Sequence, residues 1–181
     1  MQAVYIVDEA KIASVLVDPM RRAILNLLRQ KPMTQAQLAN ELGLSGASLN
    51  HHMKILRSKR LVTIAKREVE RHRIMQIFFA SVAYLFVYDL RSLPKDISRY
   101  FYPVSLERAR VLISLLMLTE KSFKIDQNPE ITNNLPERLS ELIVKTAKKY
   151  ERKSVDSSYE RIVFEIYTKA ASELMLTNAI N

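Results

Sequence analysis

Residues 34–60 read TQAQLANELGLSGASLNHHMKILRSKR, and they contain both glycines of the chain. The first part predicts a helix that begins at Thr34, because Gln37 three positions later completes a capping box. Gly43 stands where the end of a helix favours a left-handed residue. Ser45 predicts the N-cap of a second helix that runs to the end of this segment. Two helices joined by a short turn with glycine form the helix-turn-helix motif.

The second of these helices has two different faces. A helical wheel places Leu49, Met53 and Leu56 on one stripe, which predicts the buried face. The opposite face and its flanks carry Ala47, Asn50, His51, Lys54, Arg57 and Ser58. No acidic residue occurs between Glu41 and Glu68. A small, hydrogen-bonding and basic face can enter the major groove and contact base edges and phosphates; the alternative is an ordinary solvated helix face.

A basic segment follows the second helix. Val62 and Ile64 alternate with less apolar residues, which predicts a strand. Residues 66–73 are a polar, basic tip, and residues 74–79 form an apolar return. Two strands after a helix-turn-helix make a wing, and its Lys66, Arg67, Arg71, His72 and Arg73 are expected to contact flanking phosphates or the minor groove.

The charge of the chain is concentrated in this region. The 181 residues carry a formal net charge of +9. Residues 1–100 hold 16 Lys/Arg and 8 Asp/Glu, whereas residues 101–181 hold 12 and 11. Residues 54–73 alone hold 8 basic and 2 acidic side chains. A local basic excess of this kind suits a polyanion such as nucleic acid.

The composition excludes several classes of protein. With 48% hydrophobic and 26% charged residues, the chain is not dominated by disorder. It has no cysteine, which excludes disulfides and thiolate metal sites. Both glycines belong to the helix-turn-helix, so no Gly-rich phosphate loop remains. We identify no catalytic residues, expect no cofactor or metal site, and predict that the protein is not an enzyme.

Two segments resemble a known family. Residues 18–62 read DPMRRAILNLLRQKPMTQAQLANELGLSGASLNHHMKILRSKRLV, which is similar to the ArsR-like (arsenical-repressor type) winged helix-turn-helix regulators. Residues 66–79, KREVERHRIMQIFF, resemble the wing of one subgroup. The resemblance covers about residues 10–80, and it implies transcriptional regulation and homodimerisation.

Individual positions match or depart from the family pattern. His52 matches its histidine, while Asn50 and Met53 replace its usual serine and leucine. Arg60 stands where glycine usually precedes Leu-Val. The Cys or His residues of the metal-sensing members are absent, so metal sensing does not carry over.

These observations predict a set of DNA-binding residues from the helix-turn-helix and the wing. The set is Thr34, Gln35, Ser45, Ala47, Ser48, Asn50, His51, Lys54, Arg57, Lys59, Arg60, Lys66, Arg67, Arg71, His72 and Arg73.

The predicted fold is mainly α with a small β-wing, in two domains. Residues 1–90 are expected to be the winged helix-turn-helix domain, with a helix over about residues 8–17 and another that begins at Asp18-Pro19. Residues 91–181 are expected to be a helical domain for dimerisation or for a small-molecule effector. Aromatic residues between positions 78 and 102 predict a core that joins the domains, with a ligand pocket as the alternative.

Three helices are predicted in the second half, after a turn over residues 89–95. Ser105 is the expected cap of the first, whose sequence VLISLLML predicts burial on every side. Residues 123–135 are expected to be a loop, with Pro136 at the start of the second helix. Ser157 and Glu160 predict a capping box for the third helix.

The third helix carries a long apolar stripe. It consists of Tyr159, Ile162, Val163, Ile166, Tyr167, Ala170 and Leu174. Such a stripe packs either within the chain or across a dimer, and we expect a main contribution to a homodimer. The apolar helix near residues 12–16 is the other candidate for the interface.

The leading hypothesis is a sequence-specific, double-stranded-DNA-binding transcriptional regulator that acts in the cytoplasm. The start of the chain has no basic region of a signal peptide, and the uncharged residues 74–88 are too short for a membrane span. One alternative is a non-specific architectural or RNA-binding protein, which uniform affinity for any duplex would favour. Another is a winged-helix module for protein interaction, which a failure to bind DNA would favour.

Overall fold

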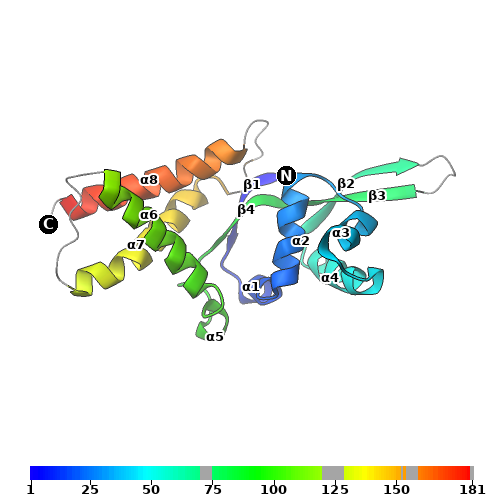
Figure 1. Ribbon diagram of the computed structural model, residues 1–181, viewed down its shortest axis with the longest axis horizontal. Helices are drawn as coiled ribbons and strands as arrows, with labels where there is room; N and C mark the ends of the chain where they lie inside the picture. Colours follow the sequence, from blue (N-terminus) through cyan, green and yellow to red (C-terminus); the bar gives the residue numbers. More distant parts are fainter. Residues whose placement is uncertain (70–74, 120–128, 152, 154–158, 180–181) are drawn as a thin grey trace.

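The computed structural model describes residues 1–69, 75–119, 129–151, 153 and 159–179. The molecule is elongated, with the helix-turn-helix and its wing at one end and a group of long helices at the other (Figure 1). The first part contains α1 (Ala10–Leu16), α2 (Pro19–Gln30), α3 (Gln35–Leu42) and α4 (Gly46–Ser58), followed by the strands β2 (Val62–Val69) and β3 (Met75–Ser81). The predicted winged helix-turn-helix fold is therefore confirmed.

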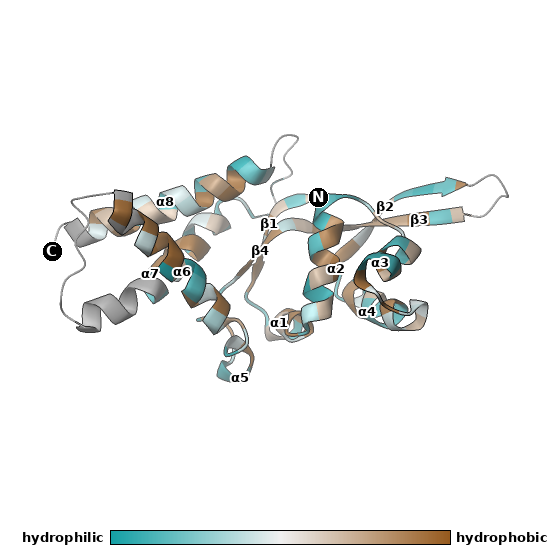
Figure 2. Ribbon diagram, viewed as in Figure 1, coloured by the Kyte–Doolittle hydropathy of each residue, from teal (hydrophilic) through white to brown (hydrophobic). Residues whose placement is uncertain are grey.

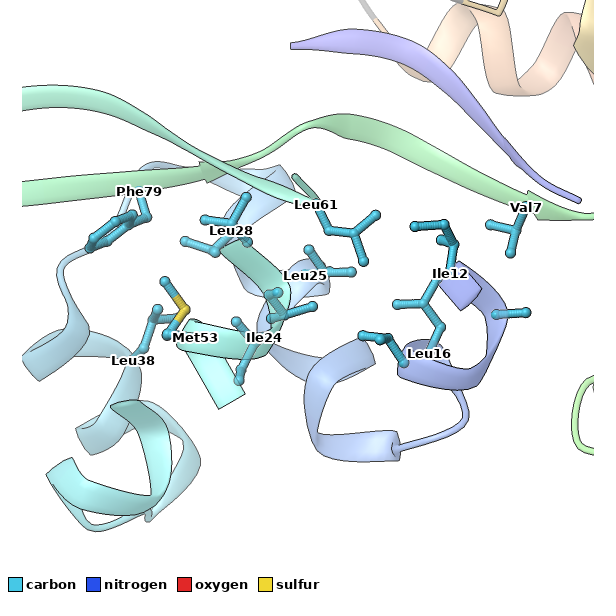
Figure 3. Packing of buried hydrophobic residues seen from close by; sticks show 14 of the residues in the cluster. Val7, Ile12, Leu16, Ile24, Leu25, Leu28, Leu38, Met53, Leu61 and Phe79 are labelled. Atoms are coloured by element: carbon cyan, nitrogen blue, oxygen red, sulfur yellow. The ribbon is translucent and has the colours of Figure 1, made fainter. Parts of the chain in front are cut away.

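The core of this part gathers one face from each helix. Leu49, Met53 and Leu56 of α4 are fully buried, as the helical wheel predicts. They meet apolar side chains of α2, α3 and β3, such as Ile24 and Phe79 (Figure 3). Because all three buried positions of α4 are filled, the rotation of this helix about its axis is fixed, and with it the set of residues that face outward.

The wing differs from its predicted form. The strands β2 and β3 pair antiparallel from Val62 opposite Ser81 to Val69 opposite Met75. Lys66 and Arg67 therefore lie within a strand, and their assignment to the tip is wrong. Lys66 pairs with Phe78 in the ladder, and aromatic partners on β3 support the strand beyond its apolar start. Arg71, His72 and Arg73 lie outside the described residues.

Two strands that the sequence did not predict join the two ends of the molecule. The strands β1 (Gln2–Val7) and β4 (Ala83–Tyr88) pair in parallel, with Val4 opposite Leu85. Ala3, Val4 and Ile6 of β1 belong to the core of the helical part, whereas Val7 belongs to the core of the helix-turn-helix. The pair thus contributes to both cores, and the division of the chain near residue 90 stays a prediction.

The helical part contains α5 (Lys95–Ser98), α6 (Tyr102–Thr119), α7 (Pro129–Lys148) and α8 (Tyr159–Ala179). The turn predicted over residues 89–95 is confirmed up to Pro94, and Lys148 Nζ holds it by an ion pair with Asp89 Oδ2 at 3.1 Å. α6 begins before Ser105, so that cap assignment is wrong.

The start of α7 was also misplaced. The helix begins at Pro129, so residues 129–135 are helical rather than loop, and Pro136 lies inside the helix. Proline fits the first position of a helix, and Pro129 takes the role expected for Pro136. Residues 123–128 and Ser157, with its predicted capping box, lie outside the described residues.

The apolar stripe of α8 is used within the chain. Ile162, Ile166, Ala170 and Leu174 are buried in the core of the helical part, against residues of α6 and α7. The apolar side chains of α1 are likewise buried, in the core of the helix-turn-helix. Both stripes that the sequence offered for a dimer are therefore covered by the protomer itself.

The helix α6 has the opposite character. Its VLISLLML segment was predicted to be buried on every side, which is wrong: Val111 is 58% exposed and Leu118 is 82% exposed. Ala109 and Ile113 face the core, because α7 and α8 cover only one side of α6. In Figure 2 the half of α6 that leads to its C-terminal end is mostly hydrophobic. No helix within the described residues is long and apolar enough to span a membrane.

Candidate nucleic-acid interface

The helix-turn-helix is held by local caps at each joint. Thr34 Oγ1 accepts a hydrogen bond from the Gln37 backbone N–H at 3.2 Å, and Gln37 Oε1 accepts one from the Thr34 N–H at 2.9 Å. The predicted capping box is thereby confirmed. Gly43 has φ 64° at the end of α3, and Ser45 Oγ caps α4 by accepting from the Ser48 N–H at 3.2 Å. These caps fix the angle at which α4 leaves the turn.

The outward face of α4 is exposed over its whole length. Ala47, Asn50, His51, Lys54 and Arg57 are all exposed, as the wheel predicts. Ser45 and Arg60 are exposed at the two ends of the helix, whereas Thr34, Gln35, Ser48 and Lys59 are half-buried. The sequence between Glu41 and Glu68 contains no carboxylate. No side chain of this segment can therefore form an ion pair with the cations of α4 in place of a phosphate.

Arg57 and Lys66 connect α4 with the wing. The guanidinium of Arg57 lies over the ring of Phe79 in β3, 5.6 Å from its centroid. Lys66 Nζ lies 4.5 Å from the centroid of Phe78 and also forms an ion pair with Glu68 at 2.6 Å. Aromatic rings thus position both cations along the strands next to α4. Arg67, on the same exposed strand, takes part in neither of these contacts.

A cluster of Asp18, Arg21 and His52 lies where the start of α2 meets the half-buried side of α4. Asp18 caps α2 by accepting from the Met20 N–H at 2.8 Å, and its carboxylate pairs with Arg21 at 3.1 Å. The same carboxylate lies 3.5 Å from His52 Nδ1 of α4. Burial alone raises the pKa of Asp18, but the N–H groups of Met20 and Arg21 and the charge of Arg21 outweigh it and hold that pKa below its ordinary value.

This cluster was missed as part of the site. His52 and Asp18 were both recognised in the family pattern, and Asp18 also as a helix cap, but their proximity was not predicted. The approach of His52 Nδ1 to the Asp18 carboxylate brings the first turn of α2 beside the middle of α4. The signal in the sequence was the half-buried position of His52 on the wheel, between the buried stripe and the outward face.

Replacement of Asp18 by alanine is expected to lower the free energy of unfolding by about 1–2 kcal/mol, since it removes the helix cap and the link to α4. Because the folded pKa is lowered, this stabilisation is present above the ordinary value of 3.8 and is lost as the pH falls through the lowered folded pKa. Denaturant unfolding at about pH 7 and about pH 3 measures it. Asp18→Asn is the control that keeps the cap, and an Asp18→Ala deficit that does not shrink in acid would contradict the electrostatic part.

Arg60 ends α4 in the left-handed conformation, with φ 56°. Its N–H donates to Arg57 O at 3.0 Å, and the Leu61 N–H donates to Leu56 O at 2.9 Å. These two bonds form a Schellman motif, which normally uses glycine at this position. The left-handed cap that the family resemblance implies is therefore kept although arginine replaces glycine. The backbone strain is accompanied by an exposed cation between α4 and the wing.

Arg60→Gly is expected to raise the free energy of unfolding by about 1 kcal/mol, because glycine adopts this conformation without the clash of a Cβ atom. Arg60→Ala should leave the strain in place and give no such gain. Both variants should weaken binding to DNA equally, since both lose the cation. A gain in stability from alanine as well would show that the charge, rather than the backbone, is the cause.

The fold and the exposed basic face of α4 define a protein of the winged helix-turn-helix class. Residues 18–63 match the family model described as "Bacterial regulatory protein, arsR family", which confirms the resemblance for this segment. These residues form an ArsR-type helix-turn-helix domain, and the match supports a DNA-binding transcriptional regulator.

A solved structure of Lactococcus lactis ZitR, a mutant in the apo form, is 16% identical, with a TM-score of 0.33, over 71% of this chain and 84% of that chain. Similarity at that level identifies no shared function. No curated protein sequence matches the chain. The described residues contain no group of three His, Asp or Glu side chains that could hold a metal ion.

Proposed function

We propose that the protein is a sequence-specific regulator that binds double-stranded DNA with α4 in the major groove. The observation that carries this proposal is the outward face of α4, which is exposed, basic and without acidic residues, and which stands on a helix whose rotation the core fixes. An α-helix fits the width of the major groove, where each base pair presents a distinct pattern of donors and acceptors.

The residues of this face divide by chemistry into two groups. Asn50 and His51 carry both donors and acceptors, so they suit the edges of bases. Lys54, Arg57 and Arg60 carry only donors and positive charge, so they suit phosphates. Ser45, the N-cap of α4, and Ala47 in its first turn are both exposed, at the end of the helix by which a recognition helix contacts base edges.

The strand β2 extends this surface. Lys66 and Arg67 are both exposed on β2; Lys66 lies over the Phe78 ring, whereas Arg67 lies opposite Ile77 in the ladder. We place these two cations on phosphates that flank the bases read by α4. Arg71, His72 and Arg73 are proposed to continue the same contact.

Arg67→Ala is expected to reduce the affinity for every duplex and to flatten its dependence on salt. Each lost phosphate contact removes about 0.9 from the slope of log K against log salt. Titration of a labelled duplex at several salt concentrations measures this slope. Arg91→Ala, which removes an exposed cation of the turn after β4, is the matched control; an unchanged slope for Arg67→Ala would remove β2 from the interface.

We also propose that the regulator is a homodimer that pairs through α6. Val104, Val111 and Leu118 follow one another at intervals of seven residues and are 52%, 58% and 82% exposed. Apolar residues at this interval form the seam between paired helices. A two-fold dimer uses the same patch on both protomers, and it would present two α4 helices to successive turns of the major groove.

These two proposed surfaces assign a separate role to each part of the chain. Residues 1–90 bind DNA, residues 91–181 carry the dimer interface, and the β1–β4 pair contributes to both cores. Uniform affinity for all duplexes would support the non-specific architectural alternative instead.

A further inference from the structure

A cavity of about 170 Å³ lies between the two parts of the molecule. Its walls come from α2, from β4, from the end of α1, and from α6 with the segment that leads into it. Three arginines line it, Arg22 and Arg29 from α2 and Arg108 from α6, and no acidic residue is among the described residues of its lining. The rings of Tyr88 and Phe101 also line it, and they stack with their centroids 4.1 Å apart.

The three guanidinium groups are not neutralised by the chain. None of them forms an ion pair with a carboxylate in the described ranges. Arg22 Nη1 donates to the carbonyls of Leu16 and Val17 at 2.6 Å each, which leaves its other N–H groups available. Arg29 lies over the ring of Tyr84, 5.5 Å from its centroid.

Arg22 and Arg108 both line the cavity although they come from different parts of the chain. Burial raises the pKa of Tyr88 to about 12, and the charges of Arg22 and Arg108 both oppose that rise. Arg22, Arg108 and Tyr88 all line the cavity, so two guanidinium groups and a donor hydroxyl border it beside the aromatic wall of Tyr88 and Phe101.

We infer that this cavity binds a small organic anion with a flat, apolar body. Guanidinium groups bind carboxylate and phosphate oxygens with paired hydrogen bonds, and the Tyr88 hydroxyl can donate a further one. The Tyr88 and Phe101 rings offer the apolar contact for the body of the ligand. Drug-sized molecules use pockets of roughly 300–1,000 Å³, so a volume of this size selects a smaller compound.

The location of the cavity gives its ligand a route to the DNA-binding surface. The helix α2 contributes Arg22 and Arg29 to the cavity, while its cap Asp18 contacts His52 of α4. An anion that draws Arg22 away from the carbonyls of α1 would shift the start of α2, and with it α4. Such a ligand changes DNA affinity only if it binds the two arrangements unequally. This regulatory role rests on the proposed DNA-binding function, whereas ligand binding does not.

The test is calorimetric titration of the full chain with benzoate at low salt, with benzamide as the neutral analogue of the same shape. Benzoate is expected to bind with a Kd of about 1 mM or tighter, and benzamide at least tenfold more weakly. Arg108→Gln and Arg29→Gln should each weaken benzoate about tenfold. Arg110→Gln is the control, because Arg110 lies on the same helix outside the lining and pairs with Glu107.

The outcomes separate the site from its regulatory role. Absence of benzoate binding, equal binding of benzamide, or equal losses from Arg110→Gln would each overturn the site. A duplex titration with and without saturating benzoate then tests regulation: a change in affinity supports it, and benzoate binding with unchanged DNA affinity overturns that role alone. If Arg108→Gln weakens DNA binding but leaves benzoate binding unchanged, the arginines belong to the nucleic-acid surface and the inferred ligand site is wrong. If the unmodified protein does not bind DNA, the proposed function is contradicted. The calorimetric result for benzoate would still support the ligand site.

Discussion

Replacement of Val111 by aspartate is expected to convert the proposed α6 dimer into a folded monomer and to weaken operator binding by about 100-fold or more. The side chain is 58% exposed in the protomer, so the charge costs little when the protomer is alone. In the dimer it would lie unpaired in an apolar seam, at a cost of several kcal/mol. The loss in DNA affinity follows because two linked DNA-binding units gain about 100- to 10,000-fold over one.

Sedimentation and circular dichroism, together with a duplex titration, measure this effect. Phe164→Asp is the matched control, because Phe164 is 72% exposed on α8 and outside the proposed seam. It should remain dimeric and bind DNA normally. If the Phe164→Asp variant dissociates and the Val111→Asp variant stays dimeric, the interface lies on α8. If the unmodified protein is a monomer, the dimer is refuted.

Asn50→Ala and His51→Ala are expected to reduce discrimination between the preferred sequence and its single-base variants. Each lost base contact should remove about 1–3 kcal/mol of discrimination, or roughly 5- to 150-fold. Because both side chains are exposed on α4, neither replacement should change the stability of the fold appreciably. Competition between labelled duplexes that differ at one base pair measures the effect.

Lys54→Ala is the control for this prediction, since it removes a cation from the same face. It should weaken binding to every duplex by a similar factor and leave the preference among sequences intact. Losses of equal size on all sequences from Asn50→Ala, His51→Ala and Lys54→Ala would contradict base reading by α4. They would favour the architectural alternative.

Short-range signals made the DNA-binding part predictable. The capping box at Thr34, the glycine at position 43 and the stripe of α4 each lie within one or two helical turns, where helix geometry fixes which residues meet. The prediction of which residues form the exposed face of α4 was correct for the same reason. Arg60 shows the limit of such reasoning, because the arginine adopts the left-handed conformation that normally favours glycine, and its residue type does not predict that.

Long-range contacts account for what the sequence did not predict. The parallel pairing of β1 with β4 joins residues about 80 positions apart, and no local pattern specifies such a partner. The apolar sequence of α6 could not show which side α7 and α8 cover. The cavity could not be predicted for a similar reason, since Arg22 and Arg29 of α2 and Arg108 of α6 are about 80 positions apart in the sequence.

Selection of bound sequences from a pool of random duplexes tests the central claim most directly, because specificity and the two-fold arrangement are read from one experiment. If α4 reads bases and the protein is a dimer, the selected sequences should converge on a palindrome whose half-sites are centred about one helical turn, or a multiple of it, apart. Bound duplexes that share no enriched sequence would contradict the account.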